Sequence, residues 1–465
     1  MPFPVPVERQ REVVCLPAKG HHVILGTAGS GKTTMAILRA AYLADPELPE
    51  NGRVLLLTYN RALAGYISTI SEGRLRNVTV ENYHRFARGY LATRNAMKPY
   101  GDIINANPRR ALIASSLKEI EAQYKPHALF SRTPTFFDTE VGWIAKNGIT
   151  ELDAYLKADR IGRGDPLPEG SRRVIWKIRE LYLEKRVAKD CRYDWDDIAV
   201  AVSEEFARDG SSRRYKHIVI DEGQDLSPQM LRSIARAIPD DGTITFFGDV
   251  AQQIYGQRVS WRSAGLQNPR KWEFTENYRN SREIAALGLA IANMDYYRGV
   301  ADMVAPVAPK AAGPKPTLVE IAPATDEGSF VAEQAKRLSQ NRSVAVLVRT
   351  VAQQDYLARL LPRGTIKLRD DSAQWIDGPQ LYLSTYHSAK GLEFDAVILP
   401  FMSDALFPDS GQVTDYGEEE ADANDGRLLY VGVTRAKSDL IITYKGKRSH
   451  LLPTLPNDLF TVVKR

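Results

Sequence analysis

The sequence predicts an α/β protein with two parallel-sheet domains and a helical insertion in the first of them. Three observations support this fold class. A glycine-rich octapeptide, residues 26–33, follows an apolar run and precedes an amphipathic stretch, as at a strand-to-helix turn. An acidic pair, Asp221-Glu222, ends a second apolar run. The runs Val344–Val348 and Ala396–Leu399 have the continuous apolar character of buried parallel strands.

The octapeptide Gly26-Thr-Ala-Gly-Ser-Gly-Lys32-Thr33 matches the phosphate-binding pattern G-x-x-x-x-G-K-[ST]. Its glycines let backbone N–H groups point at phosphate oxygens, and the helix that follows adds the positive end of its dipole. Lys32 is expected to reach the β- and γ-phosphates, and Thr33 to hold Mg²⁺. A plain glycine-rich turn is the less favoured interpretation, because the strand Val23–Leu25 leads directly into the loop. The loop therefore predicts a nucleotide triphosphatase.

The acidic pair supplies the carboxylates that such an enzyme needs. It follows the apolar run His217–Ile220. Asp221 is expected to complete the Mg²⁺ shell, usually through water, and Glu222 to polarise the water that attacks the γ-phosphate. Paired acids after a strand are also common turn formers, so the pair alone leaves both interpretations open.

Further motif-like stretches follow one another in a fixed order along the chain. They are Val54–Leu63, Thr79–Phe86, Phe246–Tyr255, Glu276–Arg279, Leu383–Asp395 and Leu428–Lys437. Together with the loop and the acidic pair, this ordered set resembles the UvrD/Rep family of superfamily 1 DNA helicases. The resemblance extends from Gln10 to Lys437, nearly the whole chain.

The resemblance implies an ATP site that is completed by residues far along the chain. Gln252 would sense the γ-phosphate, and Arg279 and Arg435 would be arginine fingers that stabilise the charge of the phosphoryl transition state. Gln10 would read the adenine, Tyr278 would stack on it, and Glu393 would accept a hydrogen bond from the ribose. The full set of expected nucleotide contacts is Gln10, Gly26, Thr27, Ala28, Gly29, Ser30, Gly31, Lys32, Thr33, Thr34, Tyr278, Gly391 and Glu393.

Aromatic side chains interleaved with cations at strand ends predict a track for single-stranded DNA. Every base offers a π-face and every phosphate a charge, so such a track needs both kinds of side chain. For Phe86 and Tyr255 the sequence leaves open a place in a domain core. The candidates are Tyr59, Asn60, His84, Phe86, Tyr255, Arg258, Trp261, Arg349 and His387.

Two departures from the family pattern concern this track and the hinge. After Ile254-Tyr255 the family commonly has a Trp-Arg step, whereas this chain reads Gly256–Trp261, so Trp261 is the candidate to replace the missing base-stacking indole. Before the last motif the chain has Asp425-Gly426-Arg427 where the family often has a glutamate and two arginines. That difference puts a salt link near the hinge in doubt.

Composition places the chain among ordinary globular proteins, with 43% hydrophobic and 26% charged residues. The absence of an apolar run of about 20 residues and of a signal peptide predicts a cytoplasmic protein without membrane contact. Cys15 and Cys191 are too few for an iron–sulfur cluster, a zinc site or a disulfide framework, so we expect no metal besides nucleotide-borne Mg²⁺. The formal net charge of +5 is mild, as expected when a basic DNA groove is offset by an acidic outer surface.

Motif spacing predicts the domain organisation. Residues 1–91 and 193–263 are expected to form the first RecA-like ATPase domain, and residues 264–465 the second. Residues 92–192 have helical periodicity and resemble the family's first helical insertion. The segment 350–380 is too short for the second helical insertion of larger members, so we expect a compact member of the family.

Two functions are compatible with these features. The first is an ATP-dependent single-stranded DNA translocase and helicase, for which the resemblance implies 3′ to 5′ polarity. The alternative is a DNA-stimulated ATPase switch that activates or regulates a partner such as a nuclease; the helicase-like subunit of Gabija-type defence systems resembles this size and layout. The expected partners are single-stranded or tailed DNA and, for the second function, a nuclease or a repair or defence protein. The sequence identifies neither the pathway nor the oligomeric state.

Overall fold

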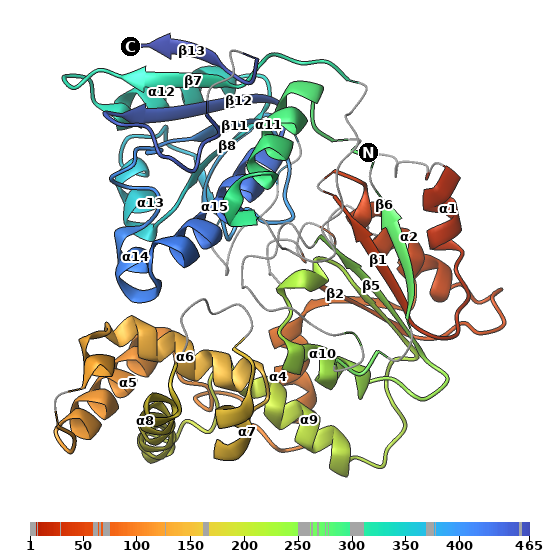
Figure 1. The fold of residues 1–465 in the computed structure, drawn as a ribbon. Helices are drawn as coiled ribbons and strands as arrows, with labels where there is room; N and C mark the ends of the chain where they lie inside the picture. The colour runs from red at the N-terminus through yellow and green to blue at the C-terminus, as the bar shows by residue number, and fades with distance from the viewer. Residues whose placement is uncertain are drawn as a thin grey trace.

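The computed structural model describes residues 6, 8–27, 29–58, 64, 67, 75–125, 127–160, 167–249, 261, 264–266, 269–274, 276–277, 279–297, 311–368, 376, 378–454 and 458–465. They form two parallel-sheet domains and a group of helices inserted in the first (Figure 1). The predicted fold class is therefore confirmed.

The first domain contains a six-stranded parallel sheet in the order β3-β2-β4-β5-β1-β6. The four inner strands are buried along their whole length, as parallel strands covered on both faces are. All carboxyl ends lie at one edge of the sheet, where the site is built. The strands are β1 (His22–Gly26), β2 (Val54–Thr58), β3 (Val78–Asn82), β4 (His217–Ile220), β5 (Thr243–Gly248) and β6 (Arg270–Phe274).

Helices cover both faces of this sheet. The first face packs against α1 (Glu8–Val14) and α2 (Lys32–Leu43). The second face packs against α4 (Tyr83–Thr93), α9 (Ile198–Arg208) and α10 (Pro228–Ala235). The two hydrophobic cores alternate along each strand, so that Ile24 packs on one side and Val23 and Leu25 on the other.

The position of strand β6 shows that the first domain ends later in the chain than the sequence predicts. It pairs in parallel with β1, and Leu25 lies opposite Glu273. The first domain therefore extends at least to Phe274, beyond the predicted end at residue 263. The strand escaped prediction because it is an edge strand with exposed charged residues and only Phe274 fully buried, so it has no apolar run.

The helical insertion lies between α4 and α9, within residues 92–192. It consists of α5 (Ala106–Glu121), the 3-10 turn η1 (Ala128–Ser131), α6 (Pro134–Lys146), α7 (Leu152–Lys157) and α8 (Glu169–Ala188). These helices enclose a hydrophobic core of their own. Inside it, Glu140 accepts from the buried Arg160 (2.8 Å) and from the Tyr155 hydroxyl (2.8 Å), which compensates the carboxylate for its loss of water.

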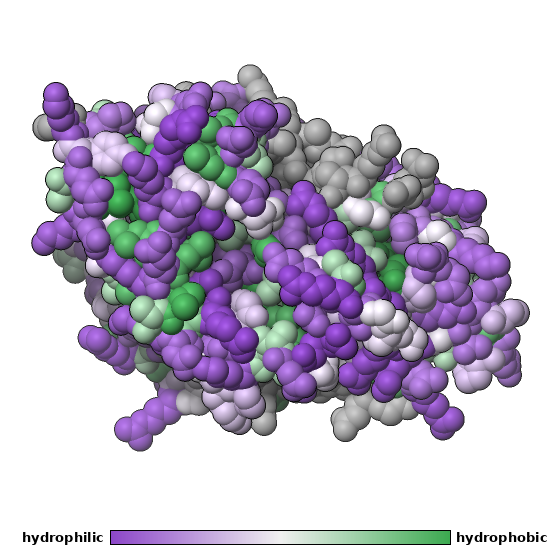
Figure 2. Space-filling view, turned by 90° about the horizontal axis from the view of Figure 1, so that it is seen from below, coloured by the Kyte–Doolittle hydropathy of each residue, from purple (hydrophilic) through white to green (hydrophobic). Residues whose placement is uncertain are grey.

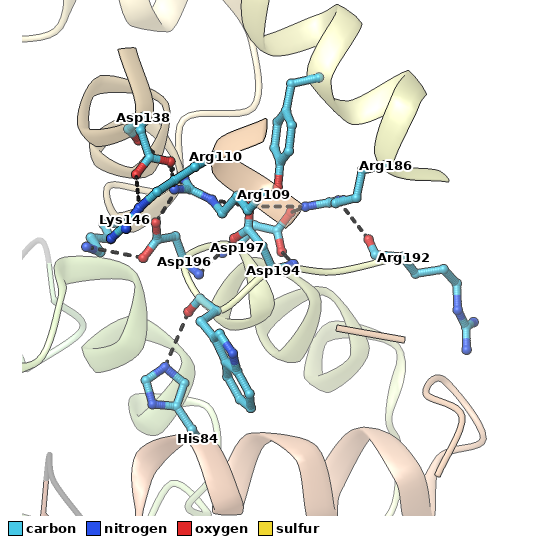
Figure 3. A network of polar contacts seen from close by, with 12 residues as sticks. His84, Arg109, Arg110, Asp138, Lys146, Arg186, Arg192, Asp194, Asp196 and Asp197 are labelled. Carbon is cyan, nitrogen blue, oxygen red and sulfur yellow. Dashed lines mark hydrogen bonds and ion pairs between the residues drawn. The ribbon is translucent and has the colours of Figure 1, made fainter. Parts of the chain in front are cut away.

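A polar network joins the insertion to the first domain where the chain enters α9 (Figure 3). Asp194 accepts from the Tyr182 hydroxyl (2.7 Å) and pairs with Arg109 of α5 and Arg186 of α8 (3.3 Å each). Asp197 pairs with the same Arg186 (2.5 Å). Residues 194–197 are therefore held by two helices of the insertion.

The second domain contains a seven-stranded parallel sheet in the order β13-β7-β12-β11-β8-β10-β9. Its strands are β7 (Thr317–Ile321), β8 (Ser343–Val348), β9 (Ile366–Leu368), β10 (Gln380–Thr385), β11 (Phe394–Leu399), β12 (Ala436–Lys445) and β13 (Thr461–Lys464). Between β8 and β10 the described residues form only α13 (Val351–Leu357) and β9.

Helices also cover both faces of the second sheet. One face packs against α11 (Arg282–Ala292) and α15 (Glu418–Thr434), and the other against α12 (Glu327–Leu338) and α13. The 3-10 turn η4 (Asp295–Tyr297) packs on α15. Helix α14 (Ser410–Tyr416) precedes α15 and approaches α6 of the insertion (Figure 1).

Seen from the side of the helical insertion, the surface is mostly hydrophilic, and hydrophobic residues form small separate groups (Figure 2). In the described ranges no helix combines the length and apolarity that a membrane span requires.

Candidate functional site

The phosphate loop, residues 26–33, connects β1 to α2 at the carboxyl edge of the first sheet. Gly29 and Gly31 have φ of +80° and +81°, a left-handed conformation that glycine adopts without strain. A Cβ atom at Gly29 would collide with Oδ1 of Asn277 and lie 2.7 Å from Cβ of Arg279. Glycine at this position therefore allows the segment that carries Arg279 to contact the loop.

Lys32 turns back into this loop. Its Nζ donates to the carbonyl oxygens of Gly26 (2.8 Å) and Thr27 (2.6 Å) and lies 3.8 Å from Oδ2 of Asp249. Burial lowers the pKa of Lys32, against the opposing effect of the Asp249 and Glu222 carboxylates. The ammonium group thus lies inside the loop, where phosphate oxygens would bind.

Gln10 and other residues of the predicted nucleotide set surround the loop. Gln10 of α1 donates through Nε2 to the carbonyl oxygen of Ser30 (3.2 Å), which places its amide beside the loop, as the resemblance implies for the adenine reader. The hydroxyls of Thr27 and Ser30 are buried and have no hydrogen-bond partner among the described residues. Thr34 is half-buried in α2. Ala28, Tyr278 and Gln252 lie outside the described residues.

Asp221 fits the predicted Mg²⁺ site. It is fully buried, and neither carboxylate oxygen has a hydrogen-bond partner within the described ranges. Burial and the neighbouring Glu222 raise the pKa of Asp221 to about 7, while the nearby Thr33 hydroxyl opposes the rise. An unpaired carboxylate beside a hydroxyl is a set of hard oxygen donors, which Mg²⁺ prefers. In the part of the chain that the structure describes, no cluster of three or more His, Cys, Asp or Glu residues forms a metal site.

Glu222 is held in its ionised form. Burial raises its pKa, but Lys390, Lys32 and Arg435 outweigh this effect and keep the pKa below its ordinary value. Its side chain accepts from Nε2 of Gln224 (2.5 Å), and Oε1 of the same Gln224 accepts from the backbone N–H of Asp249 (3.0 Å). An oriented, buried carboxylate of this kind is suited to polarise a water molecule.

A buried ion pair connects the two domains at the site. Lys390, in the loop after β10, donates through Nζ to Oδ1 of Asp225 in the 3-10 turn η2 (Gly223–Asp225) at 2.6 Å. The two side chains are only 3% and 2% exposed. Burial raises the pKa of Asp225 to about 6, and Lys390 opposes that rise.

Asp225→Asn is expected to lower the free energy of unfolding by about 3 kcal/mol, because it removes the charged partner that the buried Lys390 ammonium contacts at 2.6 Å. Denaturant unfolding measures this loss. The matched control is Asp190→Asn, which breaks the exposed Lys98–Asp190 pair (48% and 84% exposed) and is expected to change stability by less than about 1 kcal/mol. Equal stabilities of Asp225→Asn and wild type would contradict the structural role of the pair.

The two predicted arginine fingers lie near each other, Arg279 beside the phosphate loop and Arg435 beside Glu222. Arg279 follows β6 and pairs through Nη2 with Oε1 of Glu393 (2.5 Å). Arg435 lies between α15 and β12, is 1% exposed, and donates to the carbonyl oxygens of Val431 and Leu392 (3.2 Å each). Burial lowers the pKa of Arg435 to about 10, Arg279 adds to this, and the Glu222, Glu393 and Asp249 carboxylates oppose it. The Arg435 guanidinium therefore lies close to Glu222 and Asp249 of the first domain, and the Arg279 guanidinium lies near Lys32 of the phosphate loop.

Glu393 and Gly391 lie in the same loop of the second domain. Gly391 has φ of +81°. Glu393 holds Arg279 and also lies 3.9 Å from Nζ of Lys437. The contact of Glu393 with a ribose stays a prediction.

Part of the predicted DNA track is described by the structure. The ring of His84, at the start of α4, lies 3.3 Å from the carbonyl oxygen of Trp195 and packs edge-on against the Trp195 ring (Figure 3). His387 is half-buried, and burial together with Arg349 and Lys390 lowers its pKa to about 3, so the ring is neutral. Tyr59, Asn60, Tyr255 and Arg258 lie outside the described residues.

Three other candidates of this track make internal contacts. Phe86 is 7% exposed and belongs to the core of the first domain, which corrects its predicted place on the DNA track in favour of the core alternative. Trp261 packs edge-on against Phe246 (4.7 Å between centroids), and Arg349 pairs with the fully buried Asp425 (2.8 Å). Asp425 therefore makes a salt link despite the departure from the family pattern. DNA contacts of Trp261 and Arg349 stay predictions.

The sequence reasoning missed several residues that the site uses. Asn277 and Lys390 lie inside the motif-like stretches, Gln224 and Asp225 follow the acidic pair, and Asn280 follows the stretch Glu276–Arg279, but none of them was given a role. A signal was available, because each is a polar residue within three positions of an assigned one.

The fold and the candidate site define a two-domain protein of the phosphate-loop class in which the residues expected to bind nucleotide come from both domains. A family model described as the UvrD/REP helicase N-terminal domain matches residues 7–273, and one described as the UvrD-like helicase C-terminal domain matches residues 352–447. The chain belongs to the UvrD/REP helicase family.

Individual relatives are distant. A probable DNA helicase II homolog from Rickettsia felis is 31% identical over 22% of this chain, and the match spans only 15% of that relative's length. The ATP-dependent DNA helicase UvrD2 of Mycobacterium tuberculosis is 22% identical over 95% of this chain and 79% of its own length. The solved C-terminal domain of a possible DNA helicase from Lactobacillus is 23% identical, with a TM-score of 0.29 over 40% of this chain and 98% of its own.

Proposed function

We propose that this protein is an ATP-dependent DNA helicase that moves along single-stranded DNA in the 3′ to 5′ direction. The observation that carries the proposal is the convergence of the phosphate loop and the acidic pair of the first domain with Arg279, Arg435 and Lys390. A nucleotide in this place would contact both domains. Hydrolysis would then change how the domains are held together.

Each group of the site has a chemical task in ATP hydrolysis. Lys32 and the loop N–H groups would bind the phosphates, and Thr33 with Asp221 would hold Mg²⁺. Mg²⁺, when bound, neutralises charge on the β- and γ-phosphate oxygens. Glu222 orients and polarises the attacking water, for which its ionised state and its bond to Gln224 prepare it. Arg279 and Arg435 stabilise the charge that spreads over the transferring phosphoryl group.

Coupling to DNA movement follows from where these groups lie. Arg435 and Lys390 belong to the second domain, whereas Lys32 and Glu222 belong to the first. ATP binding draws the two domains together, and hydrolysis releases them. If the two domains bind the DNA strand tightly in turn during this cycle, the protein advances along the strand. Family membership supports DNA as the substrate and ATP hydrolysis as the source of energy. The proposed polarity rests on the resemblance to UvrD/Rep helicases.

We expect single-stranded DNA to raise the ATPase rate, and the affinity for that DNA to fall as salt rises, because backbone contacts release counterions. The ATPase rate measured with single-stranded, double-stranded and tailed DNA at several salt concentrations tests the proposal. The controls are reactions without DNA and reactions with Glu222→Gln. An ATPase rate that is the same with and without every DNA would contradict it.

A further inference from the structure

Two buried asparagines connect the segments that carry the arginines. Asn277 is 8% exposed and Asn280 2%. Nδ2 of Asn280 donates to the carbonyl oxygens of Thr434 (3.2 Å) and Ala436 (2.5 Å), which flank Arg435 on both sides. Oδ1 of Asn280 accepts from Nδ2 of Asn277 (2.8 Å). We call this pair the asparagine clip.

The other end of the clip fixes the turn that carries Arg279. Oδ1 of Asn277 accepts from the backbone N–H groups of Arg279 (3.0 Å) and Asn280 (3.1 Å). The same Oδ1 lies so close to Gly29 that a Cβ atom there would collide with it, so the turn also contacts the phosphate loop. A continuous line of contacts therefore runs from the loop through the clip to the backbone around Arg435.

The hydrogen bonds of the asparagine clip restrict which side chain can occupy position 280. Both hydrogens of the Asn280 amide face carbonyl oxygens, and its own oxygen faces a donor. Only a group with two donors and one acceptor, such as an amide, satisfies these neighbours. A carboxylate in the same place would face two carbonyl oxygens without a proton to share, at the cost of unmade buried hydrogen bonds.

We propose that the asparagine clip positions Arg279 and Arg435 as one unit, so that both guanidinium groups reach the same phosphate. The proposal rests on the proposed ATPase function. The arginines lie far apart in the sequence, and charge stabilisation in a phosphoryl transition state depends on their geometry to a fraction of an ångström. Asn277 and Asn280 bind the backbone that carries the arginines, so they are positioning residues.

Asn280→Asp tests the proposal with almost no change of shape. The expected result is a kcat for ATP lowered by a factor on the order of 10², with ATP KM and single-stranded DNA affinity within about twofold of wild type, since the loop and the DNA-binding residues are untouched. The matched control is Asn51→Asp. Nδ2 of Asn51 also donates to two carbonyl oxygens, those of Pro46 (3.3 Å) and Leu48 (2.6 Å), but in a loop before β2. This control is expected to keep the wild-type kcat.

A double-variant comparison separates positioning from general damage to the fold. Under single-turnover conditions, Asn280→Asp is expected to have almost no further effect on an Arg279→Ala/Arg435→Ala protein, because the clip acts through these two arginines. A merely structural residue would lower the rate by the same factor in both proteins. Asn280→Ala, which removes the amide without adding a charge, replaces the aspartate variant if that protein does not fold. Wild-type kcat in a folded Asn280 variant, or equal factors in both backgrounds, would overturn the proposal. A wild-type protein without ATPase activity would instead refute the proposed function.

Discussion

Glu222→Gln is expected to bind ATP as tightly as the wild-type protein and to hydrolyse it more slowly by a factor of about 10²–10⁴. The glutamine keeps the shape of the side chain and leaves the phosphate loop intact, but it removes the carboxylate that Lys390, Lys32 and Arg435 hold in its ionised form. Titration with a fluorescent ATP analogue and single-turnover hydrolysis measure the two effects separately. The control is Glu47→Gln, because Glu47 lies in an exposed turn. This variant is expected to keep the wild-type ATP affinity and hydrolysis rate.

Lys32→Ala is the complementary variant. It removes the cation that the Gly26 and Thr27 carbonyl groups hold inside the loop, so both ATP affinity and turnover are expected to fall. If Glu222→Gln hydrolyses ATP at the wild-type rate, Glu222 does not polarise the water, and the assignment of the catalytic carboxylate is wrong.

Arg279→Ala and Arg435→Ala are each expected to lower ATP turnover by a factor on the order of 10³, with little change in DNA affinity. Each guanidinium lies close to the phosphate loop or to the acidic pair, from a segment outside them. Steady-state hydrolysis with saturating single-stranded DNA measures turnover, and a DNA titration measures affinity. Arg337→Ala is the control, because Arg337 lies on the exposed surface of α12 and donates to Gln334 of the same helix.

The double variant Arg279→Ala/Arg435→Ala tests whether the two arginines act together. If both arginines act on one phosphate, as proposed, their combined loss is expected to be smaller than the product of the single losses. Arg279→Lys and Arg435→Lys are expected to recover little, since an ammonium group does not reproduce the planar fork of a guanidinium. Normal hydrolysis by both alanine variants would contradict an ATP site between the domains.

The sequence predicts those parts of the molecule whose chemistry is local. The phosphate loop is continuous from Gly26 to Thr33, and the acidic pair follows its strand directly, so periodicity and spacing suffice to find them. The buried central strands of both sheets are largely apolar, so a continuous apolar run in the sequence identifies them. Strand β6 escapes this reasoning because an edge strand needs little apolar surface.

Contacts between residues that lie far apart in the chain cannot be predicted in this way. The pairs Lys390–Asp225 and Arg349–Asp425 and the asparagine clip each join residues that only the folded chain brings together. Their polar side chains look alike in the sequence whether they bind DNA or one another. Arg349 illustrates this ambiguity, since the same cation that suits a phosphate also neutralises a buried carboxylate. Phe86 illustrates the same ambiguity for aromatic residues, because a ring that can stack on a DNA base can equally pack in a hydrophobic core.

The central claim is that ATP hydrolysis between the two domains drives movement along single-stranded DNA, and strand displacement tests it most directly. A labelled strand annealed next to a 3′ single-stranded tail is mixed with wild-type protein, ATP and Mg²⁺, with a 5′-tailed duplex and Glu222→Gln protein run in parallel. We predict that the wild-type protein releases the strand from the 3′-tailed duplex faster than from the 5′-tailed one, and that Glu222→Gln releases neither. ATP hydrolysis stimulated by the tailed DNA without release of either strand would contradict this account.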